Sequence, residues 1–222
     1  MNIKMDNLIK LNFLSLGGIS KIAIELLGDR LKPDQIKIYD DNPILLGQNY
    51  KDINIIGNFS DTLNLLKGSY YFNGLGSYTY YKNRISISEK LIEKGVFGYN
   101  IHHSSAIISS SATIGKGTFL AANVHIGLLC HIGQDCVVYS NTTIEHECRI
   151  GKLTYISPGV TICGKVEIDN YCYIGPGCTI SAGVKIGQKC IIGAGSIVLK
   201  DLPDGSFAFG SPARMMKKND KW

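Results

Sequence analysis

Residues 106–201 divide without a gap into sixteen hexapeptides, AIISSS ATIGKG TFLAAN VHIGLL CHIGQD CVVYSN TTIEHE CRIGKL TYISPG VTICGK VEIDNY CYIGPG CTISAG VKIGQK CIIGAG SIVLKD. The third position is Ile in thirteen of them, and Leu120, Val138 and Val198 stand in the others. The first position holds only Ala, Ser, Thr, Cys or Val. An α-helix cannot use a period of six, whereas a short strand followed by a corner can. The repeat therefore predicts a β-solenoid whose first and third positions point into the core.

Glycine follows the aliphatic residue of many hexapeptides. It stands there at Gly115, Gly127, Gly133, Gly151, Gly175, Gly187 and Gly193. Glycine adopts positive φ without steric cost, so we expect these residues to supply the backbone freedom that the corners of the solenoid need.

The seven cysteines follow the repeat more closely than they follow any disulfide or metal pattern. Six of them occupy the first position of a hexapeptide, namely Cys130, Cys136, Cys148, Cys172, Cys178 and Cys190. A free cysteine packs as a small hydrophobic residue, so we interpret this column as filler of the solenoid core. Cys163, at a fourth position, has no role in this scheme.

Length, hydropathy and charge indicate how many domains to expect and which partners they argue against. The chain has 222 residues, 45% of them hydrophobic, which suits one domain or two small ones. The first residues, MNIKMDNLIK, lack the apolar core of a signal peptide, and no apolar run approaches about 18 residues. We expect a cytoplasmic protein outside the membrane. A net charge of +5 without a basic stripe or binding motif argues against nucleic acid as a partner.

The part of the chain before the repeat alternates between apolar strand patterns and helical patterns. Strands are predicted at residues 8–16, 35–41 and 70–76, and helices at 22–30 and 86–95, and residues 97–101 lead into the repeat. Such alternation favours a small parallel, Rossmann-like α/β sheet, which we assign to residues 1–103.

Ligands of parallel sheets bind at the carboxyl ends of the strands. That edge would hold Gly17, Gly18, Asp40 and Asp41, which follow the first two predicted strands. The stretch S-L-G-G-I-S-K at 15–21 lacks the full G-x-G-x-x-G pattern, so NAD is not expected. A nucleotide or nucleotide-sugar contact and a purely structural tight turn both remain open for these residues.

The hexapeptide TTIEHE carries the one cluster of titratable side chains inside the repeat. Ile144 must point inward, so His146 at the fifth position lies outside, near a corner, between Glu145 and Glu147. A carboxylate beside an exposed histidine can fix its tautomer and stabilise the imidazolium, as in catalytic dyads. A solvated corner without chemistry is the alternative reading of the same residues.

These features together resemble one bacterial family. An α/β domain of about a hundred residues, then I-H-H-S-S-A at 101–106, then E-H-E-C at 145–148 in register with the repeat, is similar to a family of sugar acetyltransferases. The family includes sialic-acid O-acetyltransferases and N-acetyltransferases of nucleotide-linked 4-amino-4,6-dideoxy sugars. The resemblance covers nearly the whole chain. It implies a left-handed parallel β-helix over residues 104–222, with three hexapeptides in each coil.

The resemblance also implies roles for individual residues. His146 corresponds to the general base, Glu147 to the acid that orients it, and the Gly164 backbone N–H to the donor that receives the thioester carbonyl. Acetyl-CoA would lie in a groove between the subunits of a homotrimer. The residues implied on the acetyl-CoA side are Gly164, Ser157, Gly159, Ala182 and Arg214, the last in the closing motif G-S-P-A-R.

The chain departs from the family on the acceptor side. The family turn G-x-G-G-H has Ser15 in place of its first glycine and Ile19 in place of its histidine. Tyr139 and Tyr155 stand where many relatives have Asn and His. The resemblance places both tyrosines on the acceptor side, so these departures bear on which sugar is bound.

The remaining histidines do not suggest a metal site. With three hexapeptides per coil, His125 stacks below Thr143 and His131 below Arg149. A zinc site built from three histidines would need a different layout, and we expect no metal.

The function implied is acetyl-CoA-dependent N-acetylation of a nucleotide-linked 4-amino-4,6-dideoxy sugar, in the synthesis of a surface polysaccharide such as lipopolysaccharide O-antigen. O-acetylation of sialic acid or another polysaccharide sugar is the close alternative. A non-catalytic solenoid scaffold is a third possibility from a different class.

Overall fold

The structure, a computed structural model, describes residues 10–65, 67–76 and 81–218. The chain divides into two compact units, residues 1–101 and 102–222. The division falls two residues before the end expected for the N-terminal domain. The start of the first predicted strand, at residues 8 and 9, lies outside the described residues.

The N-terminal unit is built on a six-stranded sheet in the order β3-β4-β2-β1-β5-β6. Its strands are β1 (Leu11–Leu14), β2 (Ile36–Tyr39), β3 (Asn49–Tyr50), β4 (Ile53–Gly57), β5 (Tyr70–Asn73) and β6 (Phe97–Gly98). All neighbouring strands are parallel except the β3–β4 hairpin. The small parallel sheet predicted from the sequence is confirmed. The β3–β4 hairpin was not predicted.

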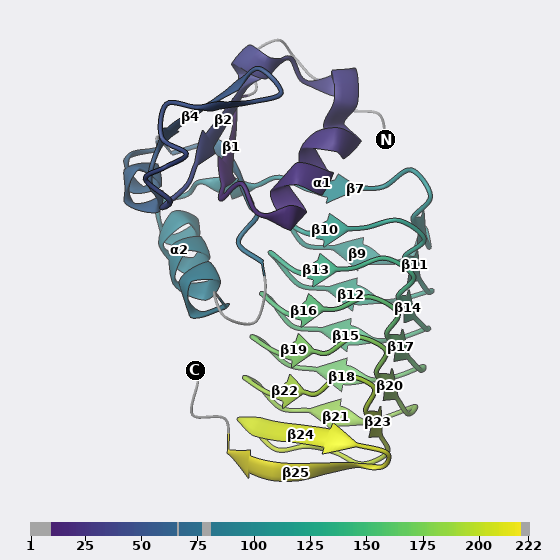
Figure 1. Cartoon of the computed structure of the whole chain (residues 1–222). Coiled ribbons are helices and arrows are strands. Elements are labelled where there is room, and N and C mark those ends of the chain that lie inside the picture. Colours follow the sequence, from purple (N-terminus) through teal and green to yellow (C-terminus); the bar gives the residue numbers. More distant parts are fainter. Residues whose placement is uncertain (1–9, 66, 77–80, 219–222) are drawn as a thin grey trace. The chain divides into compact units, whose positions relative to one another are not determined.

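Two α-helices accompany this sheet (Figure 1), α1 (Gly18–Leu27) and α2 (Tyr81–Glu93), with short 3₁₀ turns at Gly28–Arg30, Pro33–Gln35 and Phe59–Asn64. Apolar residues at helical spacing explain α1, because Ile19, Ala23 and Leu27 fall on one face and are all buried. In the sheet, Phe13 of β1 packs on Phe72 of β5 with ring centroids 5.2 Å apart.

The second unit is a left-handed parallel β-helix. Each hexapeptide contributes a two-residue strand made of its second and third positions. Strand β7 (Ile101–His102) comes before the first hexapeptide. The strands of the sixteen hexapeptides are β8 (Ile107–Ile108), β9 (Thr113–Ile114), β10 (Phe119–Leu120), β11 (His125–Ile126), β12 (His131–Ile132), β13 (Val137–Val138), β14 (Thr143–Ile144), β15 (Arg149–Ile150), β16 (Tyr155–Ile156), β17 (Thr161–Ile162), β18 (Glu167–Ile168), β19 (Tyr173–Ile174), β20 (Thr179–Ile180), β21 (Lys185–Ile186), β22 (Ile191–Ile192) and β23 (Ile197–Val198).

These strands form three parallel sheets, one for each side of the coil (Figure 1). The sheet of β8, β11, β14, β17, β20 and β23 pairs His125 with Thr143 and Ile126 with Ile144, an offset of three hexapeptides. Three hexapeptides therefore make one coil, and equivalent positions stack directly from coil to coil. A hairpin of β24 (Ser206–Gly210) and β25 (Ala213–Lys218) extends one sheet at its end.

First and third positions fill the interior, as the repeat predicts. Ile126, Ile144 and Ile162 are fully buried along one side of the core. The six first-position cysteines are buried and unpaired by disulfides, and Cys163 is free and half-buried. The interpretation of the cysteine column as core is confirmed.

The expectation for the fourth-position glycines is wrong. None of them has a positive φ. The left-handed backbone falls instead on the sixth position, as at Leu129, Glu147 and Lys165. The fourth-position glycines are needed for close approach between coils, because a Cβ on Gly133 would lie 2.5 Å from the backbone nitrogen of Lys152. No described helix is long and apolar enough to span a membrane.

Candidate active site

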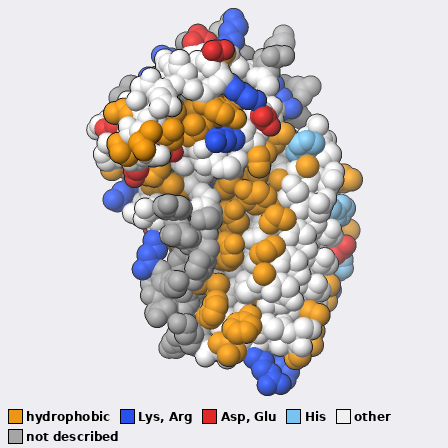
Figure 2. Space-filling model, viewed as in Figure 1, with side chains coloured by type: hydrophobic (Ala, Val, Ile, Leu, Met, Phe, Trp, Pro, Cys, Tyr) orange, Lys and Arg blue, Asp and Glu red, His pale blue; other side chains and the backbone are white. Residues whose placement is uncertain are grey.

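The candidate site lies at the corner that follows β14. Because the coils stack in register, fifth positions that are one coil apart form a column along this corner, which contains Leu128, His146, Gly164 and Ala182. The His146 side chain points outward and is 45% exposed, as its fifth position predicts. In the space-filling view, histidine side chains lie along the edge of the solenoid that carries β11 and β14, with an acidic side chain between them (Figure 2).

Glu147 fixes the orientation of the imidazole. Its Oε2 lies 3.0 Å from His146 Nδ1. An ionised carboxylate can only accept a hydrogen bond, so Nδ1 carries the proton and donates it. The neutral ring then has its lone pair on Nε2, which is the arrangement that a general base requires.

The turn itself places Glu147 for this contact. Glu147 has φ +58, the left-handed conformation that ends each corner. One coil further along, Lys165 brings its Nζ to 3.8 Å from the same Glu147 oxygen. The histidine and glutamate side chains are 45% and 43% exposed, so the pair adds little to folding stability and its effect is chiefly orientation.

The His146 ring lies directly against the backbone of Gly164. A Cβ built on Gly164 would fall 2.6 Å from the ring's Cε1 and closer still to Nε2. Only glycine leaves room for the ring at this point of the corner. Within the described part of the chain, no hydrogen-bond acceptor is found for the Gly164 N–H or partner for His146 Nε2.

This arrangement joins two chemical functions at one place. A basic ring nitrogen lies beside a backbone N–H that is free to donate to a developing negative charge. That combination suits acyl transfer, in which a nucleophile loses a proton while a carbonyl oxygen becomes an oxyanion.

The other residues predicted on the acetyl-CoA side lie at different places in the solenoid. Ala182 lies on the His146 corner, one coil beyond Gly164, and Gly183 N–H donates to Gly164 O at 3.0 Å. Ser157 and Gly159 form a different corner, after β16, and Ser157 is buried. Arg214 is exposed in β25, opposite Phe209 of the hairpin.

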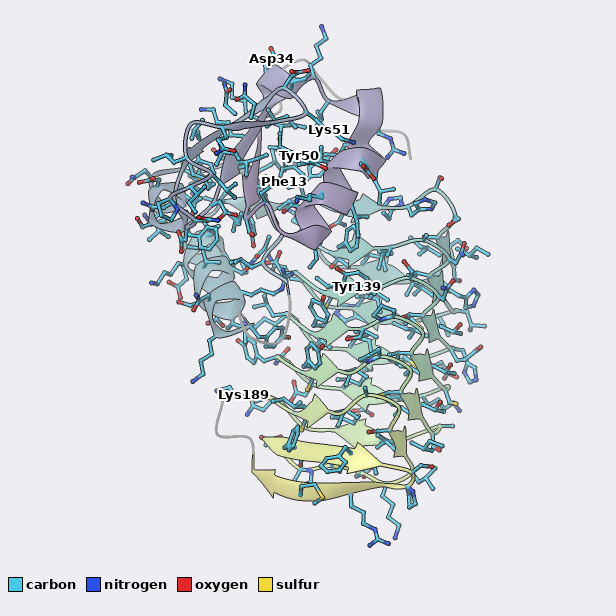
Figure 3. The ribbon with its side chains drawn as sticks, viewed as in Figure 1. Phe13, Asp34, Tyr50, Lys51, Tyr139 and Lys189 are labelled. Carbon is cyan, nitrogen blue, oxygen red and sulfur yellow. The ribbon has the colours of Figure 1, made fainter. Side chains whose placement is uncertain are left out.

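Tyr139 and Tyr155 belong to an aromatic row rather than to the His146 corner. Their ring centroids are 5.7 Å apart, and Tyr155 stacks on Tyr173 at 5.3 Å. Figure 3 labels Tyr139 on the solenoid. Tyr155 lies on β16, in the sheet of β13 and β19, whereas His146 follows a strand of the next sheet. Within one chain these tyrosines and His146 are therefore on different sides of the coil.

In the N-terminal unit, Gly17 and Gly18 begin α1 at the carboxyl end of β1. Gly17 N–H donates to Ser15 Oγ at 3.0 Å, and a Cβ on Gly18 would meet no atom within 4 Å. Ser15 has φ +76. This explains the glycine of the family pattern at that position, since a side chain is strained there. Ile19, where the family has histidine, is buried in the unit's core.

Asp40 and Asp41 bind the loops of the sheet edge. Asp40 Oδ2 accepts a hydrogen bond from Leu16 N–H at 2.7 Å, and its Oδ1 accepts one from Asn42 N–H at 2.9 Å. Asp41 Oδ1 accepts one from Phe59 N–H at 2.8 Å. Both carboxylates thus tie together the loops after β1, β2 and β4, a structural role that the sequence left open.

Sequence reasoning missed two neighbours of the site. Lys165 lies near Glu147, and Leu128 stands one coil before His146 with 53% of its surface exposed. Both follow from the period, since Lys165 comes three hexapeptides after Glu147 and Leu128 comes three hexapeptides before His146. Among the described residues, no group of three metal-ligating side chains is close enough to hold a metal ion.

Comparison with known proteins gives a family match over part of the solenoid. Residues 129–164 and 165–200 each match the family described as Bacterial transferase hexapeptide (six repeats). No curated protein sequence matches the chain.

Solved structures match almost the whole chain. PerB from Caulobacter crescentus, in complex with CoA and GDP-perosamine, is 26% identical with a TM-score of 0.80, and the match covers 95% of this chain and 98% of that one. The acetyltransferase domain of PglB from Neisseria gonorrhoeae, in complex with acetyl coenzyme A, is 25% identical with a TM-score of 0.81, over 93% and 98%. WeeI from Acinetobacter baumannii shares the fold at 22% identity and a TM-score of 0.81, over 94% and 100%.

The repeat, the β-helix and the histidine corner define a hexapeptide-repeat acyltransferase. Along both units the chain is similar to a perosamine N-acetyltransferase from Caulobacter crescentus and to the acetyltransferase domain of PglB, each at 25% identity.

Proposed function

We propose that the chain transfers the acetyl group of acetyl-CoA to the amino group of a nucleotide-linked 4-amino-4,6-dideoxy sugar. The observation that carries the proposal is the His146 ring, held by Glu147 at Nδ1 and placed with Nε2 against Gly164. The structural relative from Caulobacter crescentus, with GDP-perosamine and CoA bound, supports the substrate classes.

The proposed reaction is a direct transfer. The amine nitrogen of the acceptor attacks the thioester carbonyl, forming a C–N bond, and Nε2 of His146 takes the proton that the nitrogen loses. General-base help of this kind is typically worth about 10²–10⁴-fold. Gly164 N–H donates to the oxyanion of the tetrahedral intermediate. The C–S bond then breaks, and the proton passes to the departing CoA sulfur.

The N-terminal unit would hold the nucleotide part of the acceptor. The N-terminus of α1, with its two glycines, leaves backbone N–H groups at the carboxyl edge of a parallel sheet, where phosphates bind in many α/β folds. Asp40 and Asp41 would shape this edge through the loops that they connect, and their remaining lone pairs could accept from sugar or base.

The active sites would lie between subunits of a homotrimer. One chain places Ser157, Gly159 and Tyr139 on a different corner from His146. A groove that uses both sets, with Ala182 and Arg214 on the acetyl-CoA side and Tyr139 and Tyr155 on the acceptor side, therefore draws them from neighbouring chains. We propose a cytoplasmic enzyme that serves a surface polysaccharide such as lipopolysaccharide O-antigen.

The test is thiol release from acetyl-CoA with a panel of acceptors. The panel holds UDP-, TDP- and GDP-linked 4-amino-4,6-dideoxy sugars beside free and CMP-linked sialic acid. We expect release with one nucleotide-linked amino sugar, and a product that mass spectrometry shows to be N-acetylated. Release only with sialic acid would support O-acetylation instead.

His146→Ala provides the control for the mechanism. We expect this variant to lose about 10²-fold or more in kcat, as general-base removal does, while its thermal unfolding stays close to that of the parent chain because the side chain is outside the core. Unchanged turnover in this variant would exclude His146 as the base.

A further inference from the structure

Two buried thiols lie beneath the candidate active site. Cys130 Sγ donates a hydrogen bond to the carbonyl oxygen of Glu145 at 2.9 Å, and Cys148 Sγ donates one to the carbonyl oxygen of Cys163 at 3.1 Å. Glu145 and Cys163 are the residues immediately before His146 and Gly164. Each thiol therefore binds the peptide group that leads into one of the two proposed catalytic residues.

The Cys163 carbonyl and the Gly164 N–H belong to the same peptide group. A trans peptide is planar, and its C=O and N–H point in opposite directions. When the carbonyl points inward to Cys148 Sγ, the Gly164 N–H must point away from the core, on the outer side of the corner that also carries the His146 ring. The thiol thus fixes the direction of the donor. Accepting a hydrogen bond also polarises the peptide, which makes its N–H a better donor.

The Cys148 thiol is suited to act as a permanent donor. The side chain is fully buried, and burial raises the pKa of Cys148 to about 12, so the sulfur stays protonated. A second carbonyl acceptor, the oxygen of His146, is more distant at 3.7 Å. The contact with Cys163 O is therefore the stronger of the two.

Among the described turns of the corner that carries His146 and Gly164, only these two have a first-position thiol placed to donate to the fourth-position carbonyl. The equivalent carbonyls of the neighbouring turns belong to Gly127, Ser181 and Leu199. Fifteen residues before each of them stand Ala112, Val166 and Val184, whose side chains have no hydrogen to donate. Along this corner, a first-position side chain donates a hydrogen bond to the turns of His146 and Gly164. The adjacent coils have the same fold without such a donor.

We infer that Cys148 is a positioning residue of the active site, which orients the Gly164 N–H through the Cys163 carbonyl, and that Cys130 does the same for the turn of His146. The inference rests on the proposed function of Gly164 as the oxyanion donor. It gives the cysteine of the E-H-E-C motif a role in addition to its packing in the core.

The first-position column supplies an isosteric pair for the test. Threonine already occupies it with a donor, as in the 3.1 Å contact from Thr142 Oγ1 to Ser157 O, and valine occupies it without one at Val160 and Val166. Cys148→Val therefore removes the donor while the core stays filled, and Cys148→Thr keeps a donor. Cys178→Val is the matched control, because Cys178 Sγ donates to Gly193 O at 3.1 Å in a turn at a different corner.

We expect Cys148→Val to lower kcat about tenfold, part of the 10²–10³-fold that loss of an oxyanion donor costs, with KM for acetyl-CoA nearly unchanged. Cys148→Thr should restore most of kcat. Cys178→Val should keep the parent kcat even if its melting temperature falls as far as that of Cys148→Val. A purely structural role would lower the stability of both valine variants and the kcat of neither.

A measurement without acceptor tests the geometry directly. In protein labelled with ¹⁵N-glycine, the Gly164 amide resonance should differ between Cys148→Val and Cys148→Thr, and should stay in place in Cys178→Val. An unshifted Gly164 amide, or a threonine variant as slow as the valine variant, overturns the inference. If instead His146→Ala retains activity, the proposed function fails, and the amide shift still decides whether Cys148 orients this peptide.

Discussion

The imidazole of His146 rests on the α-carbon of Gly164, although the two residues are three hexapeptides apart in the sequence. They are neighbours because three hexapeptides complete one coil of the β-helix and its parallel strands pair in register, as Thr143 pairs with Thr161. The contact is so close that any side chain at position 164 would overlap the ring. The repeat thus builds the candidate site by stacking an imidazole on the backbone of the next coil.

Gly164→Ala should inactivate the enzyme without unfolding it. The new methyl group would push the His146 ring from its place and away from Glu147, while the φ of Gly164 is one that alanine also adopts. We expect kcat to fall by about 10²-fold, comparable to removal of the base, measured by thiol release. In the double variant with His146→Ala, the alanine at 164 should cost little more, because both changes act on the same ring. Additive losses would show that Gly164→Ala acts through something other than the ring.

Glu147→Gln should slow the reaction while the fold is kept. Glutamine can still accept the hydrogen bond from His146 Nδ1, but it cannot stabilise the imidazolium that forms when the ring takes a proton. We expect kcat to fall by about tenfold to 10²-fold. The melting temperature should change by no more than about 2 °C, since the pair is largely exposed. Lys165→Met serves as the comparison, because it removes the second partner of Glu147 and leaves the contact with His146.

The period of six made much of this molecule predictable. Position within the hexapeptide alone placed Ile144 and Cys148 inside and His146 outside, and the structure agrees. Once the coil is known to contain three hexapeptides, the period also predicts which residues of neighbouring coils stack on one another. Lys165 could have been found in this way, by counting three hexapeptides from Glu147.

Other features depend on backbone geometry that cannot be inferred from the amino-acid sequence. The sequence shows a glycine at Gly133, but only the structure shows that the next coil, rather than a positive φ, requires it. Asp40 and Asp41 follow a strand, and from that position the sequence suggested that they bind a ligand. In the structure, their carboxylates accept hydrogen bonds from backbone N–H groups of the neighbouring loops. Short irregular strands such as β3 depend on their partner in the sheet rather than on local pattern.

Cys163 should be the one cysteine that reacts readily in the folded protein. It is half-buried beside Gly164, whereas the other six thiols are buried in the core. Titration with a disulfide reagent near neutral pH should release about one equivalent quickly, and all seven cysteines in denaturant. Cys163→Ser should abolish the fast reaction. We expect acetyl-CoA to slow it, because the residue adjoins the proposed oxyanion donor. Several fast thiols would contradict the packing of the cysteine column.

The buried thiols should also make the protein less stable at alkaline pH. Burial raises the pKa of Cys130, Cys148 and Cys178 above the ordinary value of 9.0, to about 12 for Cys148. Above about pH 9 the unfolded chain loses these protons while the folded chain keeps them, so the unfolded state binds fewer protons and the free energy of unfolding falls as pH rises.

Each such thiol contributes a slope of up to about 1.4 kcal/mol per pH unit between its unfolded and folded pKa. Urea unfolding of the reduced protein from about pH 7 to about pH 10.5 measures this slope. Cys148→Val should give a shallower slope than the parent chain over the alkaline half of that range. Parallel curves for the parent and Cys148→Val would mean that the Cys148 thiol titrates in the folded protein much as it does in the unfolded chain, and that its hydrogen to the Cys163 carbonyl is not permanently held.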